Sequence, residues 1–173
     1  MPIIEKIQQM NDEFVSLRRY FHQHPELSHQ EKATSAKIAE LLTSWGIEVH
    51  TPIGQTGVVG VLKCGNGTKR VALRADIDAL PIEEANHFAH ASVNNGVMHA
   101  CGHDGHITTL LMAARYLAET KNFDGTVYFF FQPAEESGKG AQSMIADGLL
   151  EKFPADFVFG CHNWPETPEM KIG

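Results

Sequence analysis

Residues 124–136, Asp124-Gly-Thr-Val-Tyr-Phe-Phe-Phe-Gln-Pro-Ala-Glu-Glu136, join the most apolar run of the chain to two adjacent carboxylates. The Asp-Gly pair predicts a turn, and the run Thr126–Phe131 is typical of a strand buried in the centre of a sheet. Two neighbouring carboxylates at the end of such a strand repel each other, which is costly unless a cation lies nearby. A Glu-Glu pair is more often a solvated helix start, so this segment alone leaves both interpretations open.

The segments around this run alternate between helical and strand patterns. Apolar spacing of three and four residues predicts four helices, at 3–21, 28–44, 106–119 and 139–147. Short β-rich runs predict further strands at 47–50, 58–63, 70–74 and 157–161, the last of them buried. This alternation predicts a layered α/β domain with a mixed, mostly parallel sheet flanked by helices.

Three local signals refine these boundaries. His24-Pro25 ends the first helix, because the residue before a proline is pushed out of the helical region. Ser28 followed by Glu31 has the spacing of a capping box and predicts the start of the second helix. Gly65-Asn66-Gly67 predicts a hairpin turn between the strands at 58–63 and 70–74.

Composition and charge narrow the class of protein. The 173 residues hold 14 Lys and Arg against 21 Asp and Glu, a net charge of -7, and the longest basic block is Arg18-Arg19. A nucleic-acid partner or an anionic membrane surface is therefore not expected. No apolar stretch approaches the ~20 residues of a membrane span, and Met1–Lys6 lacks the apolar run of a signal peptide. Because three cysteines cannot form a closed disulfide set, we predict a reduced, cytoplasmic protein.

The densest group of chemically active side chains is Met98-His-Ala-Cys-Gly-His-Asp-Gly-His106. Thiolate, imidazole and carboxylate groups are the ligands of zinc-like cations, and glycines let the backbone approach an ion closely. A polar loop with one buried histidine is the simpler alternative, but the clustering is typical of Cys/His metal sites.

Two further segments place polar residues after predicted strands. Leu73–Pro81 contains Asp76 and Asp78, which would also fit a solvated turn with Asp caps. Gly160–Pro165 contains His162, and a single histidine there is more often structural. Because ligands of open α/β sheets sit at the carboxyl ends of strands, the four segments together predict a catalytic metal site rather than a Cys-only structural one.

Four motifs occur in order along the chain, at 18–28, 74–81, 98–106 and 132–136. Together they resemble the aminoacylase/carboxypeptidase family of dinuclear metallopeptidases. Within that family they are most similar to the branch of hippurate hydrolases, N-acyl-amino-acid amidohydrolases and plant auxin-conjugate hydrolases. The resemblance covers essentially the whole chain, and the last two motifs are specific in combination.

The resemblance implies roles for individual residues. Two divalent cations, Zn or Mn and alternatively Co or Ni, would be held by side chains of which Cys101 bridges the pair. Glu135 would be the general base, and Asp78 would hold a ligand in place. Asp76 stands where sister branches carry a ligand histidine, which His103 replaces here. The implied metal ligands are Cys101, His103, Glu136 and His162.

The resemblance also implies a reaction, the hydrolysis of a small N-acyl amino acid such as hippurate to a carboxylic acid and a free amino acid. A metal-activated water would attack the amide, and Glu135 would carry the proton to the leaving amine. Family members have a further ligand histidine and an inserted lid/dimerisation domain, neither of which is found here. We therefore expect residues 1–173 to be the N-terminal portion of the catalytic domain, with little turnover alone, and the full-length protein to form a homodimer.

Two alternatives remain at this point. A cysteine-dependent hydrolase would use Cys101 with His103 or His162, but it leaves the Glu135-Glu136 pair without a role. A truncated, non-catalytic fragment of the family would bind metal without the lid and the last ligand histidine.

Overall fold

A five-stranded sheet organises residues 4–164, the part of the chain that this computed structural model describes. The strand order is β1-β2-β4-β3-β5. The strands are β1 (Glu48–Ile53), β2 (Gly57–Cys64), β3 (Arg70–Asp76), β4 (Gly125–Gln132) and β5 (Phe157–Gly160).

Strand pairing shows that the sheet is mixed. β1 pairs with β2 and β2 with β4 in antiparallel fashion, whereas β3 pairs in parallel with both β4 and β5. The predicted mixed sheet is confirmed: of the five described strands, β1, β3, β4 and β5 run in one direction and β2 runs in the other. β1 and β2 form a hairpin that extends one side of the sheet.

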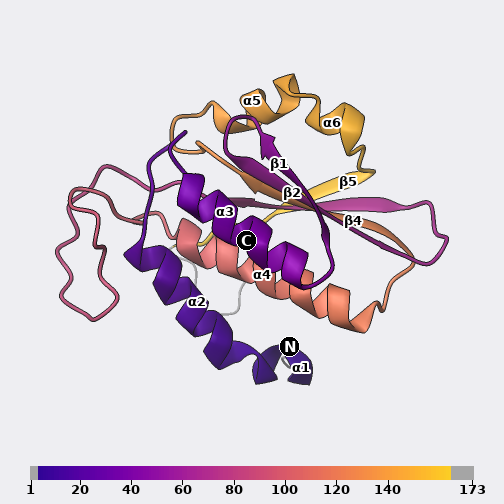
Figure 1. Cartoon of the computed structure of the whole chain (residues 1–173), viewed down its shortest axis with the longest axis horizontal. Coiled ribbons are helices and arrows are strands. Elements are labelled where there is room, and N and C mark those ends of the chain that lie inside the picture. The colour runs from indigo at the N-terminus through magenta and orange to yellow at the C-terminus, as the bar shows by residue number, and fades with distance from the viewer. Residues whose placement is uncertain (1–3, 165–173) are drawn as a thin grey trace.

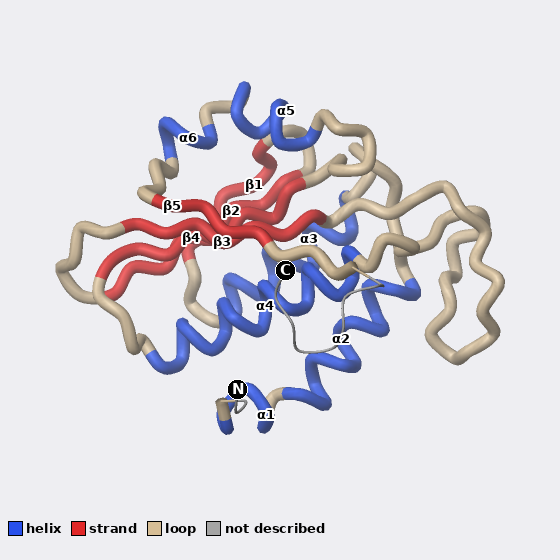
Figure 2. Tube along the Cα trace, turned by 180° about the vertical axis from the view of Figure 1, so that it is seen from behind, coloured by secondary structure: helices blue, strands red, loops and turns tan. Residues whose placement is uncertain are grey.

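Helices cover both faces of the sheet (Figure 1), and Figure 2 shows the sheet between the two helical layers. α5 and α6 lie on one face, and the longer helices lie on the other. Within residues 4–164, each helix falls short of the length or the apolarity that a bilayer-crossing segment requires. The helices are α1 (Glu5–Gln9), α2 (Asn11–Gln23), α3 (Lys32–Ser44), α4 (His103–Thr120), α5 (Gly140–Ala146) and α6 (Leu149–Lys152).

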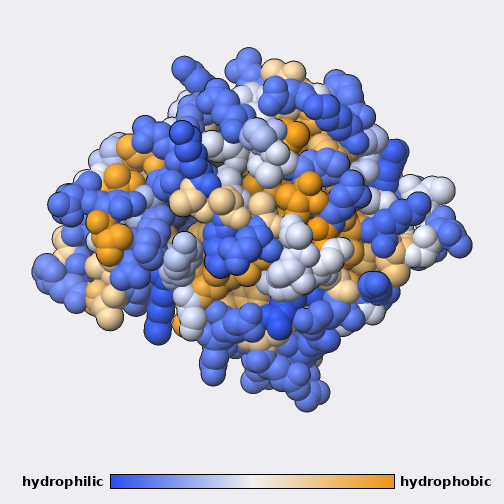
Figure 3. All heavy atoms as spheres, viewed as in Figure 1, coloured by the Kyte–Doolittle hydropathy of each residue, from blue (hydrophilic) through white to orange (hydrophobic). Residues whose placement is uncertain are grey.

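The apolar run of β4 supplies both halves of the core. Because successive side chains of a strand point to opposite faces, Phe129 and Phe131 pack with the layer of α2, α3 and α4, while Tyr128 and Phe130 pack with Met144 of α5. Burying each phenylalanine stabilises the fold by roughly 1.5–3 kcal/mol. The prediction of a buried central strand is confirmed. Figure 3 shows hydrophobic and hydrophilic areas side by side at the centre of this face, over α3 and α4, and a largely hydrophilic rim.

The start of the chain differs from the predicted helices in two ways. The helix predicted at 3–21 is divided at the buried Met10, which caps α1 and precedes α2. The predicted capping box does not form, because α3 begins at Lys32 and both of its members have distant partners. The Ser28 hydroxyl donates to Asp78 (2.6 Å), and Glu31 accepts the Thr56 hydroxyl (2.6 Å).

Two strand predictions also need correction. The turn at residues 65–67 does not close a hairpin, since β4 lies between β2 and β3, and the Gly67 N–H instead donates to Asp124 (2.7 Å). β5 is not buried, because among the strands of residues 4–164 it lies at the edge of the sheet. Its residues Phe157, Val158 and Phe159 are 62%, 54% and 57% exposed.

Candidate metal centre

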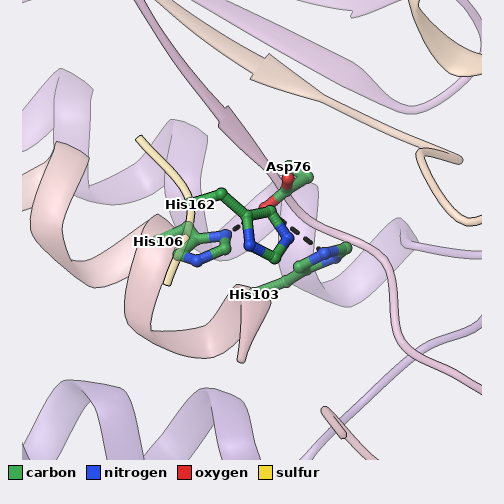
Figure 4. Close-up of side chains that lie close together, drawn as sticks. All are labelled: Asp76, His103, His106 and His162. Carbon is green, nitrogen blue, oxygen red and sulfur yellow. Dashed lines mark hydrogen bonds and ion pairs between the residues drawn. The ribbon is translucent and has the colours of Figure 1, made fainter. Parts of the chain in front are cut away.

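The four segments that the sequence singled out meet at one edge of the sheet. β3, β4 and β5 run parallel to one another, so their carboxyl ends share that edge. Asp76 ends β3, Glu135 and Glu136 follow β4, and His162 follows β5. α4 begins at the same place with His103. Figure 4 shows the side chains of Asp76, His103 and His162 converging from the end of β3, the start of α4 and the segment after β5.

Two backbone positions allow this convergence. Gly102 precedes α4 with φ of +84°, and a Cβ atom there would lie 2.7 Å from Asn163 Oδ1. Only glycine therefore lets α4 start against the segment that carries His162. After β4, Ala134 takes a left-handed φ of 50°, and its N–H donates to the buried Glu31 carboxylate (2.8 Å). This turn directly precedes Glu135.

His103 is the centre of the arrangement and is fully buried. Its Nδ1 donates to the backbone oxygen of Asp78 (2.8 Å), while Nε2 has no hydrogen-bond partner among the described residues. Carboxylate oxygens of Asp76, Glu135 and Glu136 lie 3.6, 3.7 and 3.7 Å from Nε2. Burial opposes protonation, but the hydrogen bond and charge of Asp78 and the charge of Asp76 raise the pKa of His103. A ring fixed through one nitrogen, with the other free, is how ligand histidines are held.

Two groups of donor atoms share His103, and in each group the atoms lie within 4.8 Å of one another. The groups adjoin, since Cys101 Sγ lies 3.5 Å from His162 Nε2. Sulfur, imidazole and carboxylate donors suit zinc-like divalent cations. This donor set and the unpartnered Nε2 of His103 fit a pair of such ions. The first group is Cys101, His103 and Glu136, and the second is Asp76, His103, His106 and His162.

The Cys101 thiol is not set up as a nucleophile. Burial and then the nearby carboxylates of Glu136, Asp76 and Glu135 raise the pKa of Cys101 to about 11. A catalytic cysteine needs the opposite shift, so the raised pKa, and not the 3.5 Å distance from Cys101 Sγ to His162 Nε2, argues against the cysteine-dependent alternative. A thiol of this kind loses its proton when a cation replaces that proton.

Asp78 joins two of the predicted ligands. Its buried carboxylate accepts the Glu136 N–H (3.0 Å) and the Ser28 hydroxyl (2.6 Å), and its Oδ1 lies 3.4 Å from His103 Nδ1. Burial raises the pKa of Asp78, but the hydrogen bonds from His103, Ser28 and the Glu136 backbone outweigh burial and lower it. Asp78 is therefore ionised at neutral pH and contacts both His103 and Glu136.

The sequence motifs alone assigned no role to His106 or His99. His106 lies three residues after His103 on α4, and this spacing puts both rings on one helix face. That signal could have found His106, whose Nδ1 contacts Asp76 Oδ1 at 2.6 Å. His99 is buried, and burial lowers its pKa to about 4, which keeps the ring neutral. No local pattern predicts the burial of His99.

Comparisons with known proteins agree with this geometry. The sequence model of peptidase family M20/M25/M40 matches residues 72–173. Hippurate hydrolase of Campylobacter jejuni is 51% identical over 172 residues, which cover 99% of this chain and 45% of the relative.

Solved structures give the same result. The Bacillus subtilis YXEP protein, a dinuclear metal binding peptidase from the M20 family, superposes with a TM-score of 0.87 at 40% identity, over 93% of this chain and 45% of that protein. A putative aminohydrolase from methicillin-resistant Staphylococcus aureus gives 0.86 at 44% identity, over 91% and 42%. The chain thus spans less than half the length of these relatives.

Proposed function

Since the chain belongs to peptidase family M20/M25/M40, we propose that it forms part of a metal-dependent amidohydrolase of N-acyl amino acids. The family resemblance drawn from the four motifs is confirmed, and the similarity to hippurate hydrolase supports this substrate class. The single observation that carries the proposal is the buried, unpartnered Nε2 of His103, which faces a thiol and carboxylates at the ends of parallel strands.

In this proposal two divalent cations, Zn or Mn in preference to Co or Ni, are held by Cys101, His103, Glu136 and His162. The similarity to a dinuclear metal binding peptidase supports a pair of ions. When bound, the ions would supply the positive charge that acidifies a water and polarises an amide carbonyl. Cys101 belongs to the donor group of Glu136, and its Sγ lies 3.5 Å from His162 Nε2, so its sulfur would be within reach of both ions.

Glu135 and Glu136 divide the remaining work. Both carboxylates lie 3.7 Å from His103 Nε2. The Glu136 oxygen belongs to the donor group of Cys101, whereas the Glu135 side chain is the more exposed, at 37% against 21%. Glu135 is therefore the better placed to take a proton from water and return it to the leaving amine nitrogen. Cleavage of hippurate would release a carboxylic acid and glycine.

A second candidate is a chain that binds the cations without turnover, because it spans only 45% of the length of hippurate hydrolase. In a family member with a lid/dimerisation domain, groups outside these residues would complete the site. Assembly of the whole protein into a homodimer and a cytoplasmic location remain predictions.

The test compares Glu135→Gln with Glu136→Gln in the protein as it is expressed from its gene. Metal content by elemental analysis and hippurate hydrolysis are measured for each. We expect Glu135→Gln to keep its metal and to lose about 10²–10⁴-fold in kcat, the usual contribution of a general base, and Glu136→Gln to lose metal. Normal turnover by Glu135→Gln would contradict the assignment of the base. Metal without turnover in the unsubstituted protein would favour the second candidate.

A further inference from the structure

His106 belongs to a donor group, but both of its ring nitrogens are already engaged. Nδ1 donates to Asp76 Oδ1 at 2.6 Å, and Nε2 accepts the backbone N–H of Asn163 at 3.1 Å. Asn163 Oδ1 also lies 2.5 Å from Nε2, but a nitrogen that accepts the N–H cannot donate to this oxygen, so the backbone N–H is the hydrogen bond that engages Nε2. His103 differs, because its Nε2 has no partner among the described residues. The contacts of His106 are those of a side chain that holds another segment.

Asp76, the residue that contacts Nδ1 of His106, is held in place by the sheet. Asp76 is fully buried at the end of β3, and its Oδ2 accepts from Arg74 at 2.8 Å. Arg74 in turn donates to Gln132 Oε1 at 2.9 Å, which ties β3 to β4. The imidazole of His106 is therefore fixed from two directions, by the rigid start of α4 and by a carboxylate that the sheet holds in place.

In the part of the chain that the structure describes, the segment that His106 contacts makes few other hydrogen bonds. It follows β5, the exposed edge strand, and His162 itself is exposed. The His162 ring lies edge-on to the His106 ring, with centroids 4.5 Å apart. Within residues 4–164, its Nδ1 has one hydrogen-bond partner, the backbone oxygen of Asn163 (2.7 Å). Figure 4 shows the two rings side by side, with Asp76 behind them.

We propose that Asp76 and His106 form a positioning pair, which fixes the chain at Asn163 and thereby aims His162 at Cys101. The proposal rests on the proposed function in one respect, that His162 is a metal ligand. Partners that orient ligands in this way are worth roughly 10–100-fold in metal affinity. His106 thus acts through His162 and not by binding a cation itself.

Three substitutions of His106 separate positioning from bulk. His106→Ala removes both contacts. The glutamine of His106→Gln puts its side-chain amide at the position of Nε2 and can still reach Asn163. The asparagine of His106→Asn puts its amide at the position of Nδ1 and reaches only Asp76. The matched control is His50→Ala on β1, a partly exposed histidine that pairs with Glu48 (2.9 Å). Circular dichroism checks that each variant is folded, and if His106→Ala is not, the Gln and Asn variants decide.

The first readout needs no metal. In the metal-free protein, the Asn163 amide is followed by hydrogen exchange in ¹H–¹⁵N spectra. We expect faster exchange in His106→Ala and His106→Asn, an intermediate rate in His106→Gln, which keeps the contact with Asn163 but loses that with Asp76, and no change in His50→Ala. The same exchange rate in all variants would overturn the proposal.

The second readout is a Co²⁺ titration followed by the absorption of the Cys101 thiolate bond to cobalt. We expect affinity to fall about 10–100-fold in His106→Ala, and to recover only in part in His106→Gln, which lacks the Asp76 contact. Unchanged affinity in His106→Ala would overturn the proposal while leaving the proposed function intact. If the unsubstituted protein binds no Co²⁺, the proposed function fails and His162 has no ion to meet, and the exchange experiment alone then shows whether the contact exists.

Discussion

Two histidines of this chain lie among carboxylates, His103 in the candidate metal centre and His22 on α2, and they differ in how their second nitrogen is used. His22 Nδ1 lies 3.0 Å from Asp104 and Nε2 lies 3.1 Å from Glu84, so both nitrogens have partners. His103 has one partnered nitrogen and one without a hydrogen bond in residues 4–164. A ring with both nitrogens satisfied is structural, whereas a buried ring with a free nitrogen is suited to a cation.

The two centres are neighbours on α4, because Asp104 follows His103 directly. Arg18 also donates to the buried Asp104 carboxylate, at 3.2 Å. Glu84 accepts the Ser92 N–H (2.6 Å) and thereby fastens the loop that leads into the Cys101 motif. His22 and Arg18 therefore hold the first turn of α4 through Asp104. The same turn places His103 next to the candidate ligands.

The largest expected effect comes from exchanging the two rings in turn for alanine. His103→Ala removes a ligand shared by both donor groups and should lower Zn²⁺ affinity by more than the roughly 100-fold of a supporting residue. His22→Ala should keep that affinity within a few-fold, but it leaves two buried carboxylates short of a donor and should cost about 1–3 kcal/mol of stability. Zn²⁺ titration and urea unfolding of both variants measure this. Equal metal affinities of His103→Ala and His22→Ala would show that the free nitrogen of His103 does not set it apart from His22.

A smaller effect should come from the carboxylate that joins the ligands. Asp78→Asn keeps the side-chain shape but removes the charge next to His103 and weakens the acceptor of the Glu136 N–H. We expect metal affinity to fall about 10–100-fold with the fold retained. Asp147→Asn is the matched control, because Asp147 also accepts a backbone N–H, that of Gly54 (2.7 Å), away from the site. A loss of affinity in the control would show that the effect is not specific to Asp78.

Much of the fold could be predicted because its signals are local. The apolar run of β4 predicts a strand with two buried faces, and His24-Pro25 predicts the end of α2. The errors arose where a distant partner decides the outcome. Ser28 caps no helix because Asp78, fifty residues away, takes its hydroxyl. β5 is as apolar as a central strand, and only its place at the sheet edge leaves it exposed.

The candidate site likewise has a part that local sequence patterns predicted and a part that depends on distant residues. Residue types and strand ends predicted that the four segments would form one metal site, and the family resemblance implied the ligands Cys101, His103, Glu136 and His162. These four side chains lie together at one edge of the sheet, and their role as ligands stays a prediction. The state of each ring nitrogen was not predictable, because it depends on atoms brought from other elements. His106 and His103 share one motif and one helix face, yet Asp76 and Asn163 occupy both nitrogens of the first and leave Nε2 of the second free.

The smallest expected effect is a pH dependence of stability that comes from the group of His22, Asp104 and Glu84. Burial raises the pKa of Glu84, but the Ser92 N–H, Asn86 and His22 outweigh burial and hold the pKa at about 2, below its ordinary 4.5. The unfolded chain therefore takes up this proton first, so the stability that Glu84 adds is complete above pH 4.5 and is lost as the pH falls from 4.5 towards 2. Glu84→Gln should lower the free energy of unfolding by about 1–2 kcal/mol at pH 7. Urea unfolding at stepwise lower pH should show this difference shrinking below pH 4.5.

The control is Glu40→Gln, at an exposed carboxylate paired with Lys37, which should show almost no difference at any pH. Because Glu84 touches no candidate ligand, metal affinity at pH 7 should be unchanged in Glu84→Gln. A difference in stability that stays constant down to pH 3 would mean that the Glu84 charge does not brace the loop.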